Sequence, residues 1–210
     1  MGLLRRGRTI PVRPRRRTAS RRGAPALIGA VVAVLVLTGC GASGWETDCE
    51  TDTQGIIRCV GEHRPAMPQL NAELLDGSSF DPASVRGQVL VVNFWGSWCP
   101  PCRAEAADLE ATYQATRDQE VAFLGINVRD ERDKAQAFEQ GRVSYPSVFD
   151  PGSRLALDFN IPPNSIPATM IVDRDGRIAT VVRREIRQEE LQPLVEQVAA
   201  EGIRADPVDG

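Results

Sequence analysis

Residues 89–102 read VLVVNFWGSWCPPC, an apolar run that ends in two cysteines enclosing two prolines. The run from Val89 to Trp95 is almost continuously apolar and rich in valine and aromatic side chains, which predicts a strand buried on both faces of a parallel sheet. Proline is tolerated in the first turn of a helix, because the amides there have no partner within the helix. Pro100 and Pro101 therefore mark the start of a helix, which we expect to run to about Gln119.

This arrangement places Cys99 at the N-terminus of the helix and Cys102 about one turn further on. Unpaired amides and the helix dipole favour negative charge at that end, so they should stabilise the Cys99 thiolate. Thiolate is the attacking species, so Cys99 is predicted to form a mixed disulfide with a partner protein, which Cys102 resolves by attacking Cys99. A purely structural disulfide is the less favoured interpretation.

Residues 1–39 have the layout of an export signal, with nine arginines, no acidic residue and an apolar run at 26–37. That run of about a dozen residues is shorter than the ~20 that a membrane-spanning helix needs. It ends in LTGC at 37–40, which resembles the lipobox of bacterial lipoproteins. The resemblance implies cleavage before Cys40 and a lipid anchor on its sulfur, which would hold the protein at the extracytoplasmic face of the cell membrane. An uncleaved short anchor is the alternative, and it also places the domain outside.

The remainder of the chain is acidic. The whole sequence has 25 basic and 28 acidic residues, so the part after residue 39 carries 16 basic against 28 acidic side chains, a net charge of −12. Affinity for nucleic acid depends on lysine and arginine gathered against the phosphates, so we exclude nucleic acid as a partner.

The chain has five cysteines, an odd number, so disulfide pairing within an exported protein leaves one cysteine without a partner. Lipidation of Cys40 would account for it. Cys49 and Cys59 flank a turn predicted at residues 54–55, so a hairpin would bring them together and an oxidising compartment would close a structural disulfide. One alternative is a second redox pair that exchanges electrons with the first. Another is a zinc site built from both pairs, which we disfavour because zinc ribbons repeat a tight CxxC.

Further apolar patterns follow the cysteines. The predicted elements are strands at 121–128, 169–172 and 177–182 and helices at 132–140 and 188–200. Strands that alternate with helices imply right-handed βαβ units, and Asp-Gly at 175–176 is a strong hairpin signal. We therefore expect a signal peptide at 1–39, a tether with the small hairpin at 40–68, an α/β domain at 69–202 and a flexible tail at 203–210.

Residues 91–105, VVNFWGSWCPPCRAE, resemble the TlpA/ResA family of thioredoxin-like proteins. Further matches at the family's spacing are Tyr145-Pro146, Asp150, SIPAT at 165–169 and IVDRDG at 171–176. The resemblance covers roughly residues 66–200 and implies a thioredoxin-like α/β fold, in which helices flank a central mixed β-sheet and an extension precedes it. Since the cysteines carry the chemistry, we expect neither a cofactor nor a metal.

The same resemblance implies roles around the redox pair. Pro167 would be a cis-proline that faces the two cysteines, and the backbone at Ile166 would pair with the substrate peptide. Cis peptide bonds are essentially confined to X-Pro, so a cis bond between Ile166 and Pro167 is possible. An ordinary trans proline is the alternative. Apart from the resemblance, Trp98 is predicted to cover the disulfide beside the docking groove, and Pro100 and Pro101 are expected to contact the substrate there.

The buried cysteine must lose its proton before it attacks, and in thioredoxin a buried aspartate on this strand accepts that proton. Here the corresponding residue is Asn93, which cannot accept the proton of the buried cysteine. Glu105 lies three residues beyond Cys102, on a similar helix face, and matches an acidic position in ResA-like proteins. We predict it to be the proton acceptor or pKa modulator. The alternative is a solvated carboxylate that only complements the helix dipole.

By resemblance, the function is that of ResA-like reductases, which keep the heme-binding cysteines of apocytochrome c reduced. Client proteins with cysteine pairs and a CcdA- or DsbD-like membrane thiol transporter, as electron donor, are the implied partners. A DsbA-type thiol oxidase would use the same cysteines in the opposite direction. A redox-inactive binding lipoprotein that has kept the fold is a further alternative. The segment at residues 159–165 is longer and richer in proline than the short segment that usually precedes the cis-proline in this family, so the sequence does not identify the client.

Overall fold

The structure of the chain is a computed structural model that describes residues 49–162 and 164–202. The predicted signal peptide, the predicted lipidation site Cys40 and the predicted tail lie outside the described residues. Within the described part, no helix combines the length and the apolar character needed to cross a bilayer.

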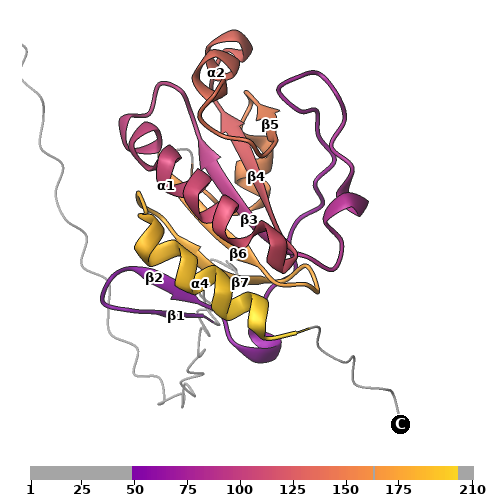
Figure 1. The fold of residues 1–210 in the computed structure, drawn as a ribbon, viewed down its shortest axis with the longest axis vertical. Coiled ribbons are helices and arrows are strands. Elements are labelled where there is room, and N and C mark those ends of the chain that lie inside the picture. Colours follow the sequence, from indigo (N-terminus) through magenta and orange to yellow (C-terminus); the bar gives the residue numbers. More distant parts are fainter. Residues whose placement is uncertain (1–48, 163, 203–210) are drawn as a thin grey trace, which may run out of the picture. The chain divides into compact units, whose positions relative to one another are not determined.

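The described residues form a seven-stranded mixed sheet in the order β1-β2-β7-β6-β3-β4-β5 (Figure 1). At its centre, β3 (Val89–Trp95) runs parallel to β4 (Val121–Val128) and antiparallel to β6 (Ala168–Val172). β5 (Ser147–Asp150) extends the sheet beyond β4, and β7 (Ile178–Val182) extends it beyond β6. All seven residues of β3 are buried, as its continuous apolar run predicts.

Helices cover both faces of this sheet. α1 (Pro100–Thr116) and α4 (Gln188–Ala200) lie side by side over one face (Figure 1). Leu109 of α1 and Val195 of α4 pack there with Val91 of β3 in one buried cluster. Side chains alternate between the faces of a strand, so Val91 and its second neighbours in β3 point toward these two helices.

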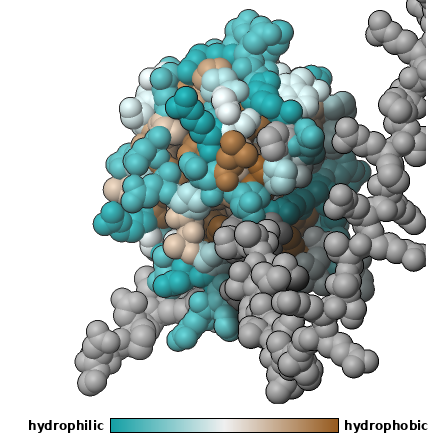
Figure 2. All heavy atoms as spheres, turned by 180° about the vertical axis from the view of Figure 1, so that it is seen from behind, coloured by the Kyte–Doolittle hydropathy of each residue, from teal (hydrophilic) through white to brown (hydrophobic). Residues whose placement is uncertain are grey.

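The other face of the sheet is covered by the short helix α3 (Arg154–Asp158) and the chain that follows it. Ala156 and Phe159 pack with Phe94 of β3, and the rings of Phe94 and Phe159 meet edge to face with centroids 5.3 Å apart. Figure 2 shows the molecule from behind: hydrophilic side chains cover most of that surface, with small hydrophobic areas between them. Both faces of the sheet are thus shielded from water, as a thioredoxin-like fold requires.

The predicted elements match the structure to within a few residues. The helix expected to reach Gln119 is α-helical to Thr116 and continues as a 3₁₀ turn at Arg117–Gln119. The sequence did not predict β5 or α3, because elements of four and five residues are too short to show a period. α2 (Arg132–Glu139) packs against the end of β3 that leads into the cysteine motif.

The hairpin that contains the first cysteine pair is part of the sheet. β1 (Glu50–Thr51) pairs with β2 (Ile56–Arg58), and a disulfide joins Cys49 and Cys59. β2 also pairs with β7, which makes the hairpin the edge of the sheet rather than a separate part of the tether. The physical reason is apolar burial, because Ile56 and Ile57 of β2 enter the clusters on opposite faces of the sheet.

Replacing both hairpin cysteines, Cys49→Ser with Cys59→Ser, is expected to lower the free energy of unfolding by about 2 to 3 kcal/mol, because the closed loop restricts the unfolded chain. Chemical denaturation of the oxidised protein measures this loss. Disulfide exchange on a protein substrate should persist in the folded variant. Loss of exchange activity with an intact fold would point to the second-redox-pair interpretation instead.

Candidate active site

The second cysteine pair is a disulfide at the N-terminus of α1. Cys99 is the N-cap residue, and its Sγ accepts a hydrogen bond from the Cys102 amide at 3.3 Å. Pro100 and Pro101 occupy the first turn, where no amide hydrogen is needed. Both cysteines are only 3% exposed. The helix terminus thus directs an amide dipole at the Cys99 sulfur, the atom predicted to carry negative charge.

A small hydrophobic cluster surrounds the disulfide. Beside the two cysteines it contains Leu75, Trp95, Ala106, Ala135 and Phe138, with Phe149 and Ile166 packed against it. The peptide bond between Ile166 and Pro167 is cis, the conformation that the family resemblance implies. Because Ile166 packs on the same cluster as Cys99, the cis-proline segment and the helix terminus belong to one site.

Trp98 is the exposed aromatic residue next to the disulfide, with 46% of its surface accessible. Its Nε1 donates to the carbonyl of Val128 at 3.3 Å, and the guanidinium of Arg129 lies over its ring, 4.6 Å from the centroid. A Cβ on Gly96 would lie 2.6 Å from the Trp98 Nε1, so glycine is required for the indole to fold back across its own loop. The ring is therefore held in place at the surface beside Cys99.

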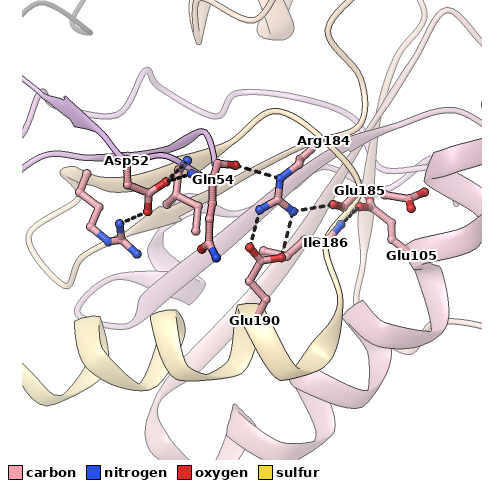
Figure 3. Close-up of polar contacts among 9 residues, drawn as sticks. Asp52, Gln54, Glu105, Arg184, Glu185, Ile186 and Glu190 are labelled. Atoms are coloured by element: carbon pink, nitrogen blue, oxygen red, sulfur yellow. Dashed lines mark hydrogen bonds and ion pairs between the residues drawn. The ribbon is translucent and has the colours of Figure 1, made fainter.

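Glu105 is buried, at 2% exposure, and not solvated as the alternative interpretation supposed. Its Oε1 accepts from Asn93 Nδ2 at 2.9 Å. Its Oε2 accepts from the Ile186 amide at 3.1 Å (Figure 3). Burial raises the pKa of Glu105 to about 8 against these two hydrogen bonds, and the negative charges of Glu185 and Asp108 add to the rise. Asn93 also donates to Thr169 at 3.1 Å, two residues beyond Pro167.

The loop that supplies the Ile186 amide is itself fixed (Figure 3). Arg184 donates to Glu190 Oε2 of α4 at 2.9 Å and to the carbonyl of Glu185 at 3.0 Å. It also donates to the carbonyl of Gln54 at 3.3 Å, in the turn of the N-terminal hairpin. Glu105 is thus held by a loop that is attached both to α4 and to the hairpin.

A second carboxylate near the disulfide, Glu139 at the end of α2, was not singled out from the sequence. Burial raises the pKa of Glu139 to about 7. The Ser147 hydroxyl donates to this carboxylate and accepts from Trp95 Nε1 at 3.2 Å. Glu139, Cys102 and Tyr145 line a cavity of about 10 Å³ beside the Cys99–Cys102 disulfide. A cavity of that size has room for roughly one water molecule. No sequence signal marks Glu139, because its partner Ser147 lies in the unpredicted strand β5.

Known proteins with similar sequences share the thioredoxin fold or act on disulfides. Residues 64–181 match the model of the AhpC/TSA family. The thiol:disulfide interchange protein HelX of Rhodobacter capsulatus is 30% identical over 173 residues, which cover 80% of this chain and 93% of HelX. The thiol-disulfide oxidoreductase ResA of Geobacillus kaustophilus is 26% identical over 125 residues, which cover 59% of this chain and 71% of ResA.

Solved structures show the same fold. A secreted thiol-disulfide isomerase from Corynebacterium glutamicum has a TM-score of 0.67 at 30% identity, covering 72% of this chain and 96% of that protein. A DsbF homologue from Corynebacterium diphtheriae has a TM-score of 0.64 at 30% identity, covering 70% and 96%. The chain therefore belongs to the AhpC/TSA family of thioredoxin-fold proteins and is a thiol-disulfide oxidoreductase of the TlpA/ResA-like kind.

Proposed function

We propose that the chain is an extracytoplasmic protein-disulfide reductase in which Cys99 attacks and Cys102 resolves. The observation that carries this proposal is the Cys99–Cys102 disulfide at the N-terminus of α1, with the Cys102 amide directed at the Cys99 sulfur. That amide and the helix dipole stabilise a thiolate on Cys99 when the pair is reduced.

In the reduced enzyme, the Cys99 thiolate attacks a client disulfide, a mixed disulfide forms and one client thiolate leaves. Cys102 then loses its proton and attacks the Cys99 sulfur, which releases the second client thiolate and closes the enzyme disulfide. Two electrons pass to the client, so a CcdA- or DsbD-like membrane thiol transporter must return two electrons to the Cys99–Cys102 pair.

The proton of Cys102 passes to Glu105. The two residues are one turn apart on α1, and Asn93, which hydrogen-bonds Glu105, also lines the cavity beside Cys102. A pKa of about 8 suits a group that must both accept and return a proton near neutral pH. Asn93 therefore positions the carboxylate rather than replacing it as the acceptor.

The client peptide docks beside the disulfide, where its backbone pairs with Ile166 next to the cis-Pro167. Trp98 forms the exposed wall of this docking site, and Pro100 with Pro101 forms its floor at the helix start. Support comes from the packing of Ile166 on the cysteine cluster and from the fixed position of the Trp98 ring.

The clients are the heme-binding cysteines of apocytochrome c, and the enzyme is anchored by a lipid on Cys40 at the outer face of the cell membrane. Similarity to proteins named ResA supports the client class. Two similar solved structures are described as secreted proteins, from Corynebacterium glutamicum and Mycobacterium tuberculosis, which supports the extracytoplasmic location.

The equilibrium reduction potential of the Cys99–Cys102 pair tests this proposal. Titration against glutathione and dithiothreitol is expected to give a value near or below the roughly −270 mV of thioredoxin. The Cys49→Ser/Cys59→Ser variant assigns the transition to the correct pair. A value near the roughly −120 mV of DsbA would make the protein an oxidant of exported proteins. An insulin-reduction assay without turnover would favour a redox-inactive binding lipoprotein.

A further inference from the structure

A broad groove of about 760 Å³ opens beside Trp98, on the side of the active site formed by α2. Side chains from the start of α1, the β4–α2 loop and α2 with its C-terminal turn line it. We call it the basic groove, and the residues that define it are Trp98, Arg103, Arg129, Lys134, Phe138 and Arg142. Trp98 precedes Cys99 and Arg103 follows Cys102 in the chain, so the basic groove lies beside the cysteine pair.

Three guanidinium groups of the basic groove are held without being neutralised. Arg103 and Arg142 lie against the ring of Phe138, 5.2 and 4.9 Å from its centroid, and Arg129 lies over Trp98. Arg103 and Arg142 each donate to a backbone carbonyl, at 3.3 and 2.7 Å. None of the three forms an ion pair with any residue in the described ranges. These contacts orient the arginines and leave their charges available.

The acidic residues in the wall of the groove are occupied by local partners. Asp130 accepts from the amide and the hydroxyl of Ser97, at 2.6 and 2.9 Å, and from Asn127 Nδ2 at 2.9 Å. Glu131 pairs with Lys134 at 2.6 Å. Glu131 and Lys134 cancel each other, and Asp130 keeps its charge, so the three arginines leave the groove with a net charge of +2.

This positive area stands out against the rest of the protein, because the chain beyond residue 39 carries a net charge of −12. Arg129 also has a left-handed backbone, with φ of 51°, which is uncommon for a residue other than glycine or asparagine. Such a conformation persists only where the surroundings enforce it, and these cases cluster at binding sites.

We propose that the basic groove binds aspartate and glutamate side chains of the client polypeptide that flank the cysteine being attacked. This inference rests on the proposed function and specifies its substrate class: disulfide-bonded polypeptides with acidic residues beside a cysteine. Guanidinium groups bind carboxylates through two parallel hydrogen bonds, and stacking on aromatic rings orients them in advance. Charge complementarity also speeds encounter, so an acidic client is attacked faster than a neutral one.

Two synthetic peptides test the inference with the full chain in non-ionic detergent. Each contains one intramolecular disulfide, and they differ only in three flanking residues, glutamate in one and glutamine in the other. The measured quantity is the second-order rate constant for peptide reduction by the reduced enzyme. We expect the glutamate peptide to react about tenfold faster at low ionic strength. That ratio should fall toward one as salt screens the charges.

The triple variant Arg103→Gln/Arg129→Gln/Arg142→Gln is expected to bring the ratio of the two rate constants to about one. The single variant Arg142→Gln should lower the ratio as well, and it provides a readout should the triple variant fold poorly. Arg117→Gln is the matched control: its side chain is 51% exposed beyond the end of α1 and outside the basic groove, so both rate constants should be unchanged.

The outcomes separate the two proposals. Equal rates with both peptides in the unmodified chain, or a preference that survives the loss of the arginines, would overturn the basic groove as an acidic-client site and leave the reductase proposal intact. Failure to reduce either peptide would overturn the proposed function and this inference with it.

Discussion

Cys102→Ser is expected to trap the enzyme in a mixed disulfide with its client and to lower turnover by about three orders of magnitude or more. The hydroxyl of serine cannot attack the Cys99 sulfur, so the bond between Cys99 and the client persists. Incubating the reduced variant with oxidised insulin, followed by a non-reducing gel and mass spectrometry, would detect the adduct and its site.

Cys99→Ser is the counterpart, which should lose turnover equally and form no adduct. Both cysteines are 3% exposed, but Cys102 lies one turn into α1 and lines the cavity of about 10 Å³, whereas Cys99 caps the helix and receives its amide dipole. An adduct on Cys102 in that variant would reverse the two roles. The Cys49→Ser/Cys59→Ser variant controls for the other disulfide and should retain turnover.

The centre of the fold could be predicted from the sequence because its signals are local. The apolar run at Val89–Trp95 needs no partner to identify it as a buried strand, and two prolines mark where α1 begins. The position of the cysteines at a helix terminus follows from these two signals alone. The cis conformation of Pro167, in contrast, could be predicted only from family resemblance, because nothing in the local sequence determines whether an X-Pro bond is cis.

The remaining features of the site depend on contacts between distant segments. Burial of Glu105 requires the loop at Ile186, which is 81 residues away in sequence. Glu139 is marked only by its contact with Ser147. The basic groove brings together Arg103 of α1, Arg129 of the β4–α2 loop and Arg142 after α2. A sequence pattern records the residue types involved, but not which of them the chain brings together.

Glu105→Gln is expected to change how stability depends on pH. In the oxidised protein, Glu105 has a pKa raised to about 8, whereas the unfolded chain has the ordinary value near 4.5. Between these values the folded state holds a proton that the unfolded state has lost. The free energy of unfolding should therefore fall as pH rises from about 4.5 to about 8, by roughly 1.4 kcal/mol per pH unit.

Glutamine does not ionise, so the variant should lose this part of the pH dependence. Glu139, whose pKa is raised to about 7, contributes a slope of the same sign to both proteins, so their difference isolates Glu105. Urea denaturation at intervals between pH 5 and 8 measures it. Glu189→Gln, at an exposed position on α4, is the matched control and should follow the unmodified chain.

The same substitution separates a chemical role for Glu105 from a structural one. Without an acceptor for the Cys102 proton, decay of the mixed disulfide should slow by about 10²-fold at neutral pH. In the unmodified enzyme that rate should also rise as Glu105 loses its proton near pH 8. Quenched-flow kinetics with a disulfide peptide measures both effects. An altered stability profile with unchanged decay would show that Glu105 shapes the interior around Cys102 without taking its proton.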